Sequence, residues 1–204
     1  MKRMFVLLVF VAAFSALSVV AKADELVFTA TLTGPNEVPQ SSSPGTGFAV
    51  VTINGNLMTV SATFSGLVTT TATGAPSGTT ASHIHCCAPA TGVAGVATAI
   101  PTFPGFPLGV TSGTYTQTFD LTLASTYNPA FITARGGTVD AARLAFLNAL
   151  QNGQTYFNIH SNAFPGGEIR GQLQPVPEPA TLVLLGTGLA GVAIRRRKKA
   201  QRRP

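Results

Sequence analysis

The stretch "INGNLMTVSATF", residues 53–64, decides the fold class. Its apolar side chains alternate with mostly hydroxyl-bearing ones, at Met58, Val60, Ala62 and Phe64. Alternate residues of a strand point to opposite faces, so one face is apolar and the other is polar. Asn54-Gly55 precedes the alternation and tolerates the positive φ angles of a tight hairpin turn. The stretch therefore predicts an antiparallel strand pair with one face in contact with solvent.

The same alternation recurs at residues 26–33 and 114–121. Short strands separated by Gly- and Pro-rich turns are typical of a β-sandwich or barrel. One segment, 138–153, instead spaces its apolar residues as a helix does, with Asp140 near its start and Gly153 as a C-terminal cap. Residues 92–113 predict a long loop. We therefore expect an all-β, antiparallel sandwich with one short helix, spanning residues 24–174.

The net charge of +6 is concentrated at the two ends of the chain. Between Asp24 and Gln174, three arginines stand against six carboxylates, which leaves a net charge of −3. A nucleic-acid-binding domain needs a basic patch on its folded surface. Nucleic-acid binding is therefore excluded as a function of this segment.

Residues 1–23 have the three parts of a signal peptide. A short positive start precedes an apolar run from Met4 to Val20, and Ala21-Lys22-Ala23 forms a small-x-small cleavage site. We predict cleavage after Ala23, with Asp24 as the mature N-terminus; the alternative is an uncleaved anchor. Export makes a disulfide chemically possible.

Residues 175–204 read as a break, a short apolar helix and a basic tail. Residues 180–194 form an uncharged apolar run, which as a helix spans about 22 Å at 1.5 Å per residue. The hydrocarbon core of a bilayer is about 30 Å thick, so this predicted transmembrane helix is short for a permanent span. The basic tail, 195–204, should stay on the cytoplasmic side.

The order Pro177-Glu178-Pro179, apolar helix, basic cluster resembles a PEP-CTERM sorting signal. The resemblance implies processing by an exosortase-type membrane protease near these residues, in a Gram-negative bacterium that makes exopolysaccharide. It also implies a transient stay in the inner membrane. The mature protein would then be released or attached outside the cell, at the outer surface or in the extracellular matrix.

Three further motifs resemble a CHRD domain, the module named from chordin. They are "TGPNEVP" (33–39), "SHIH" (82–85) and "YFNIHSNAFPGGEIRGQL" (156–173). The resemblance covers nearly the whole exported segment. It implies an immunoglobulin-like or superoxide-dismutase-like sandwich, and it implies more about the fold than about the function.

All three histidines lie in these motifs. His83 and His85 share one strand face, and His160 shares a face with Asn158 in the later motif. If the two strands are neighbours, three imidazoles converge, which suits zinc or copper. The H-x-H pair is similar to the copper-binding pair of copper/zinc superoxide dismutase, although the other ligands of that family have no match here. The alternative is that the histidines only make hydrogen bonds.

The only cysteines, Cys86 and Cys87, are adjacent. They are too close for an ordinary loop-closing disulfide, which leaves a vicinal disulfide, metal thiolates, an intermolecular bridge or free thiols. Strand parity places Cys87 on the face of His83 and His85, so Cys87 is the better metal-ligand candidate of the two.

Glu168 and Arg170 also share a strand face, which predicts a surface ion pair worth about 0–1 kcal/mol. As a general base, Glu168 would need a partner acid in a cleft, and the sequence offers none. We therefore expect a non-enzymatic exported protein that binds an extracellular protein, a polysaccharide or a metal. The competing hypothesis is a copper or zinc metalloprotein, redox-active or not.

Overall fold

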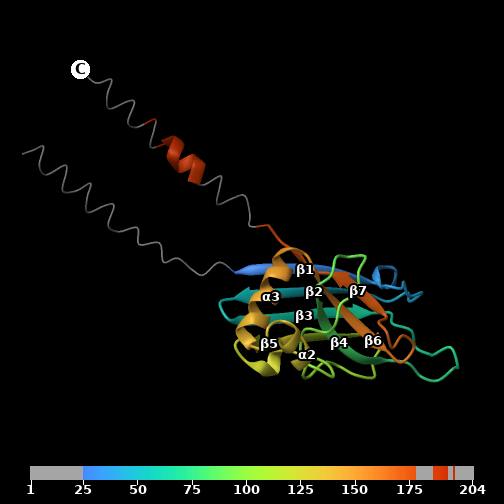
Figure 1. Ribbon diagram of the computed structural model, residues 1–204. Coiled ribbons are helices and arrows are strands. Elements are labelled where there is room, and N and C mark those ends of the chain that lie inside the picture. Colours follow the sequence, from blue (N-terminus) through green and yellow to red (C-terminus); the bar gives the residue numbers. More distant parts are fainter. Residues whose placement is uncertain (1–24, 178–185, 193–194, 196–204) are drawn as a thin grey trace, which may run out of the picture.

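The structure, a computed structural model, describes residues 25–177, 186–192 and 195. Within these residues the strands form one antiparallel sheet in the order β4-β6-β7-β1-β2-β3-β5, with β8 paired to β1. The sheet curls into a half-barrel (Figure 1). The strands are β1 (Leu26–Thr33), β2 (Thr46–Asn54), β3 (Leu57–Ser65), β4 (Thr79–Cys86), β5 (Gly113–Asp120), β6 (Thr155–Ser161), β7 (Ile169–Gln172) and β8 (Gln174–Pro175).

The β2–β3 hairpin is the one that the alternation in 53–64 predicts. Asn54 pairs with Leu57 at its closed end, and Gly55 adopts a φ of 59° in the turn. The apolar residues of β3 are buried, while Thr59 and Ser61 on the opposite face bond to Thr118 and Thr116 of β5. The prediction of an antiparallel all-β fold is thus confirmed. A single curled sheet takes the place of two separate sheets.

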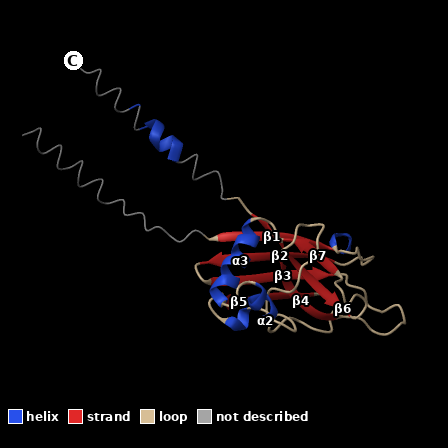
Figure 2. Cartoon of the chain, in the orientation of Figure 1, coloured by secondary structure: helices blue, strands red, loops and turns tan. Residues whose placement is uncertain are grey.

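Helices cover one end of the half-barrel (Figure 2). The helix predicted over 138–153 is present as α3 (Val139–Gln151), with Thr138 capping the amide of Ala141. Its buried side chains, which include Phe146, pack on the core. A second helix, α2 (Pro129–Ala134), was not predicted, and neither were the short 3₁₀ turns η1 (Gly34–Asn36) and η2 (Ala124–Thr126).

The core lies on the concave face of the sheet. Phe157 and Ile159 of β6 and Ile84 of β4 contribute to it and are fully buried. Phe103, from the loop between β4 and β5, stacks on Phe157 with ring centroids 6.0 Å apart. The predicted long loop is therefore part of the packed interior.

This loop, residues 87–112, also covers the free edge of β4. Backbone groups of the loop pair with those of the strand. The Cys86 amide donates to the Gly95 carbonyl, the Ala97 amide to the Ile84 carbonyl, and the Phe103 amide to the Ser82 carbonyl. An uncovered edge strand would present unpaired backbone groups to solvent, and the loop satisfies them. It then leads to β5, at the opposite edge of the sheet.

Several predictions fall outside the described residues. These are the signal peptide with its cleavage site at Ala23 and Asp24, and the motif residues Glu178 and Pro179. Of the predicted span at 180–194, only 186–192 are described, and they are helical. Within the described ranges, no helix combines the length and the apolar composition that crossing a bilayer requires.

Gly171 in β7 gives a test of the packing between β7 and β1. A Cβ at this position would collide with the Thr31 carbonyl oxygen and with the Leu32 side chain. We predict that Gly171→Ala lowers the free energy of unfolding by about 1–3 kcal/mol, because a strand backbone cannot move aside. Urea unfolding measures this effect. Gly166→Ala, where nothing lies within 4 Å of the added Cβ, is the control. Equal stability of the two variants would contradict the prediction.

Candidate metal centre

The histidines lie on two neighbouring strands. In the β4–β6 ladder, Ala81 pairs with His160, His83 with Asn158, and His85 with Tyr156. Directly opposed residues of an antiparallel pair project to the same face. The apolar residues of both strands, such as Ile84 and Phe157, occupy the other face and enter the core. The H-x-H spacing and the strand pairing together bring the three imidazoles to one side of the sheet.

The three rings are in mutual contact range. The centroid of the His83 ring lies 5.9 Å from that of His85 and 5.4 Å from that of His160. The His85 and His160 centroids are 6.2 Å apart. One ring nitrogen from each residue lies within 4.8 Å of those of the other two. This is the only group of three or more His, Cys, Asp or Glu residues with that geometry among the described residues.

Each imidazole is held by one backbone carbonyl. His83 Nε2 bonds to the Pro101 oxygen at 2.7 Å, His85 Nδ1 to the Ala94 oxygen at 2.8 Å, and His160 Nδ1 to the Pro165 oxygen at 2.9 Å. A carbonyl oxygen only accepts, so each of these nitrogens carries the proton.

The second nitrogen of each ring is therefore an unprotonated acceptor. These atoms are His83 Nδ1, His85 Nε2 and His160 Nε2, and all three are buried without a hydrogen-bond partner among the described residues. Metal-binding histidines in proteins are oriented in this way, by a bond from the N–H that does not face the ion. The three carbonyls thus select the tautomers that a metal site needs.

Burial also keeps the cluster neutral. It lowers the pKa of both His83 and His85 to about 4, and the carbonyls of Pro101 and Ala94 only partly oppose it. Burial lowers the pKa of His160 as well, against the Pro165 carbonyl. A neutral imidazole is the metal-binding form, so protons do not compete with an ion near neutral pH.

The cluster fits a small transition-metal ion that prefers nitrogen ligands. Zinc binds imidazole nitrogen at about 2.0–2.1 Å, which sets tetrahedral ligand atoms about 3.4 Å apart. The ring nitrogens, which lie within 4.8 Å of one another, would have to approach by up to roughly 1.4 Å to hold such an ion. Copper also accepts three imidazoles.

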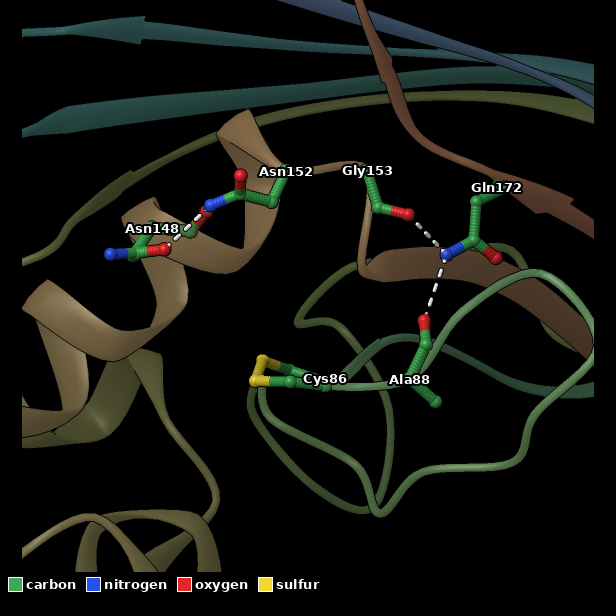
Figure 3. The surroundings of a disulfide bond; sticks show 7 residues. Cys86, Ala88, Asn148, Asn152, Gly153 and Gln172 are labelled. Carbon is green, nitrogen blue, oxygen red and sulfur yellow. Dashed lines mark hydrogen bonds between the residues drawn. A yellow bond between two sulfur atoms is a disulfide. The ribbon is translucent and has the colours of Figure 1, made fainter.

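Cys87 does not join the histidines. It forms a disulfide with Cys86 at the end of β4, and the pair lies close to the C-terminal end of α3 (Figure 3). Of the alternatives left open by the sequence, the structure contains the vicinal disulfide. A disulfide sulfur is not a thiolate, so Cys87 is not a ligand in this form.

A cation–π stack supports the cluster from the side. The His85 ring stacks on Tyr156 at 4.6 Å between centroids, and the Arg170 guanidinium lies 3.5 Å above the centroid of the same Tyr156 ring. Arg170 Nη2 donates to the carbonyls of Ala90 and Gly92 in the covering loop. Arg170 therefore fixes both the aromatic ring and the loop that carries the His85 partner.

The predicted surface ion pair of Glu168 and Arg170 is wrong. Both side chains are buried, with exposures of 0% and 1%, and they have separate partners. Glu168 Oε1 accepts from Ser43 Oγ at 2.7 Å and from the Val68 amide at 2.6 Å. Glu168 lies in the bend before β7, and there its carboxylate joins two loops.

Two residues beside the cluster were not singled out as functional from the sequence. Asn158, 2% exposed, lies opposite His83, and Glu37, 5% exposed, follows η1. Burial raises the pKa of Glu37 to about 7, against the Arg170 charge and a contact with Asn158, both of which lower it. Asn158 was visible in the alternation of "YFNIH". Glu37 is distant in sequence, and no local pattern indicates its contact with Asn158.

Fold and site together define a small antiparallel β-domain with a buried histidine cluster at one edge of its sheet. Residues 28–173 match the family model of the CHRD domain, and residues 175–198 match that of the PEP-CTERM protein-sorting motif. The chain therefore belongs to the CHRD family and carries a PEP-CTERM motif, as the resemblances predicted. Comparison with curated proteins and with solved structures found no match.

The opposite pKa shifts of Glu37 and the histidines give a test in the metal-free protein. The lowered pKa values of His83 and His85 contribute stability that is lost as pH falls from about 6.5 to about 4. The raised pKa of Glu37 contributes stability that is lost as pH rises from about 4.5 to about 7. Glu37→Gln removes only the second effect.

We predict that the stability of Glu37→Gln relative to the wild type rises as pH increases from about 4.5 to 7, by up to about 1.4 kcal/mol per pH unit. Urea unfolding at several pH values measures this difference. Glu25→Gln, at an exposed position, controls for the removal of a carboxylate. If the difference in free energy of unfolding between Glu37→Gln and the wild type did not change with pH, the raised pKa of the buried Glu37 carboxyl would be contradicted.

Proposed function

We propose that this protein is a non-enzymatic binding protein that acts outside the cell. The observation that carries the proposal is the arrangement of the chain, in which a CHRD domain at 28–173 is followed directly by a sorting motif at 175–198. A PEP-CTERM motif implies export and cell-surface sorting in Gram-negative bacteria. In this proposal the β-domain is the part that remains to act after processing.

The partners follow from this arrangement. An exosortase-type protease recognises the segment around Pro177, and the apolar helix holds the chain in the inner membrane until it is cut. The released or surface-attached domain then binds an extracellular protein or exopolysaccharide in the matrix. The net charge of −3 between Asp24 and Gln174 supports such a partner over a nucleic acid.

Replacement of Pro177, Glu178 and Pro179 by alanine tests the sorting. We expect the altered protein to stay with the inner-membrane fraction at the mass of the unprocessed chain, because the protease no longer recognises it. Cell fractionation and mass spectrometry measure both properties, and Gln117→Ala, at an exposed position outside the motif, is the control. Unchanged location and mass would refute the proposal.

A second candidate function, metal binding, is favoured by one specific observation. Three imidazoles, each fixed by a backbone carbonyl, bring buried and unpaired ring nitrogens within 4.8 Å of one another. Unpaired buried acceptors are costly, and a zinc or copper ion would pair all three. The protein would then hold the metal as part of its extracellular binding role.

We predict that untagged protein binds about one Zn²⁺ or Cu²⁺ per chain and that His160→Ala lowers the affinity at least 10-fold, because one of three ligands is lost. Equilibrium dialysis with elemental analysis measures stoichiometry and affinity. His160 is the least buried of the three, so this variant disturbs the fold least. Gln117→Ala, at an exposed position, is the control. Equal affinity in the wild type and His160→Ala would exclude the site.

A further inference from the structure

The histidine cluster has a fourth acceptor atom on the same face. We infer that the amide oxygen of Asn158 is the fourth ligand of the metal centre and that Glu37 positions it. This inference rests on the metal-binding function proposed above. The sequence suggested Cys87 as a further ligand, but its sulfur is bonded to Cys86. In the inferred site an oxygen atom from β6 takes that place.

The register places Asn158 at the centre of the site. It lies opposite His83 in β4 and opposite Arg170 in β7, two residues from His160 on its own strand. Its side chain therefore shares the face of the three imidazoles. Asn158 is 2% exposed, and its Oδ1 has no hydrogen-bond partner among the described residues.

The Asn158 amide contacts both Glu37 and His85. This amide has a donor atom and an acceptor atom. The acceptor, Oδ1, is buried without a hydrogen-bond partner among the described residues.

Oδ1 of Asn158 and Nε2 of His85 are two buried acceptors on the same face of the sheet, and neither has a hydrogen-bond partner among the described residues. His85 Nε2 cannot donate, because the proton of this ring is on Nδ1 and bonds to Ala94. Two buried acceptors without a donor between them are unfavourable. A cation held by the three imidazole nitrogens, which lie within 4.8 Å of one another, would give both acceptors a favourable contact.

Glu37 is held where it can orient the amide. Its carboxylate packs against Gly167, where a Cβ would collide with Oε1, so only glycine lets the carboxylate approach this closely. The Arg170 charge also lies near it and favours the ionised carboxylate. Carboxylates that hold ligand side chains in this way are a general feature of metal sites. Gly167, in the Gly-Gly-Glu part of the CHRD-like motif, thus leaves room for the Glu37 carboxylate.

The resulting set is three imidazole nitrogens and one amide oxygen. It fills the four positions of tetrahedral zinc and leaves none for a substrate, as in structural sites. For copper, an amide oxygen is a known weak axial ligand beside stronger donors. The geometry therefore points to a closed site that retains an ion, in agreement with a binding role.

Co²⁺ provides the test, since its d–d absorption reports coordination number. The probe is Co²⁺ added to the full-length, untagged chain in detergent, with sodium azide as an external ligand. For the wild type we expect an intense four-coordinate spectrum that azide does not change. For Asn158→Ala we expect an affinity at least 10-fold lower and an azide-dependent spectral shift, because a position at the ion is open to solvent. For Glu37→Gln we expect about 10-fold weaker binding.

Asn148→Ala, at an exposed position of α3, is the matched control, and the thermal unfolding of each metal-free variant reports folding. If the wild type binds no Co²⁺, or if His160→Ala binds it equally well, the metal centre itself is refuted. If Co²⁺ binding depends on His160 but Asn158→Ala keeps both the affinity and the azide-insensitive spectrum, only the assignment of Asn158 is refuted. An azide response in the wild type also overturns the closed site.

Discussion

The hydrogen bonds from sheet side chains to the carbonyls of the 87–112 loop are the constraint on which the rest of this structure depends. The loop has no regular partner on the outer face of β4 and β6, so its carbonyl oxygens need donors. His83, His85 and Arg170 provide them, at Pro101, Ala94 and the Ala90–Gly92 turn, and the Tyr156 hydroxyl is a second donor to Ala94. Gln172 adds a bond to Ala88 (Figure 3). Without these donors the loop would bury unpaired carbonyls, at a cost of about 1–3 kcal/mol each.

The same bonds create the chemistry of the site. Each imidazole donates its single N–H to a backbone carbonyl, so the other ring nitrogen is an acceptor. Burial under the loop lowers the pKa of both His83 and His85 and so favours the neutral rings. Stability of the loop and readiness of the nitrogens for a metal ion therefore have one physical origin. For this reason, variants at His83 and His85 would change both the stability of the loop and the ligand nitrogens. Variants at His160 and Asn158 would change the ligand atoms with less effect on the loop.

Much of the fold could be predicted from local pattern. The strands at 26–33, 57–64 and 114–121 and the helix near 138–153 follow from a period of 2 or 3.6 residues, because one face of each is apolar. The shared face of His83 and His85 follows in the same way. Glu168 and Arg170 could not be placed correctly, because their alternation is that of a surface strand. A loop far along the chain buries Arg170, and Ser43 and Val68 bury Glu168.

The sequence by itself determined the class of fold, the sorting motif, the family and the three histidines as metal-ligand candidates. These depend on periodicity, composition and motifs, which are local properties of the chain. Only the tertiary structure decided that β4 and β6 are neighbours, that the cysteines pair with each other, and that Asn158 and Glu37 lie beside the histidines. Such contacts join residues up to about 120 positions apart, from Glu37 to Asn158, and hydrogen bonding and burial across that distance leave no trace in local sequence pattern.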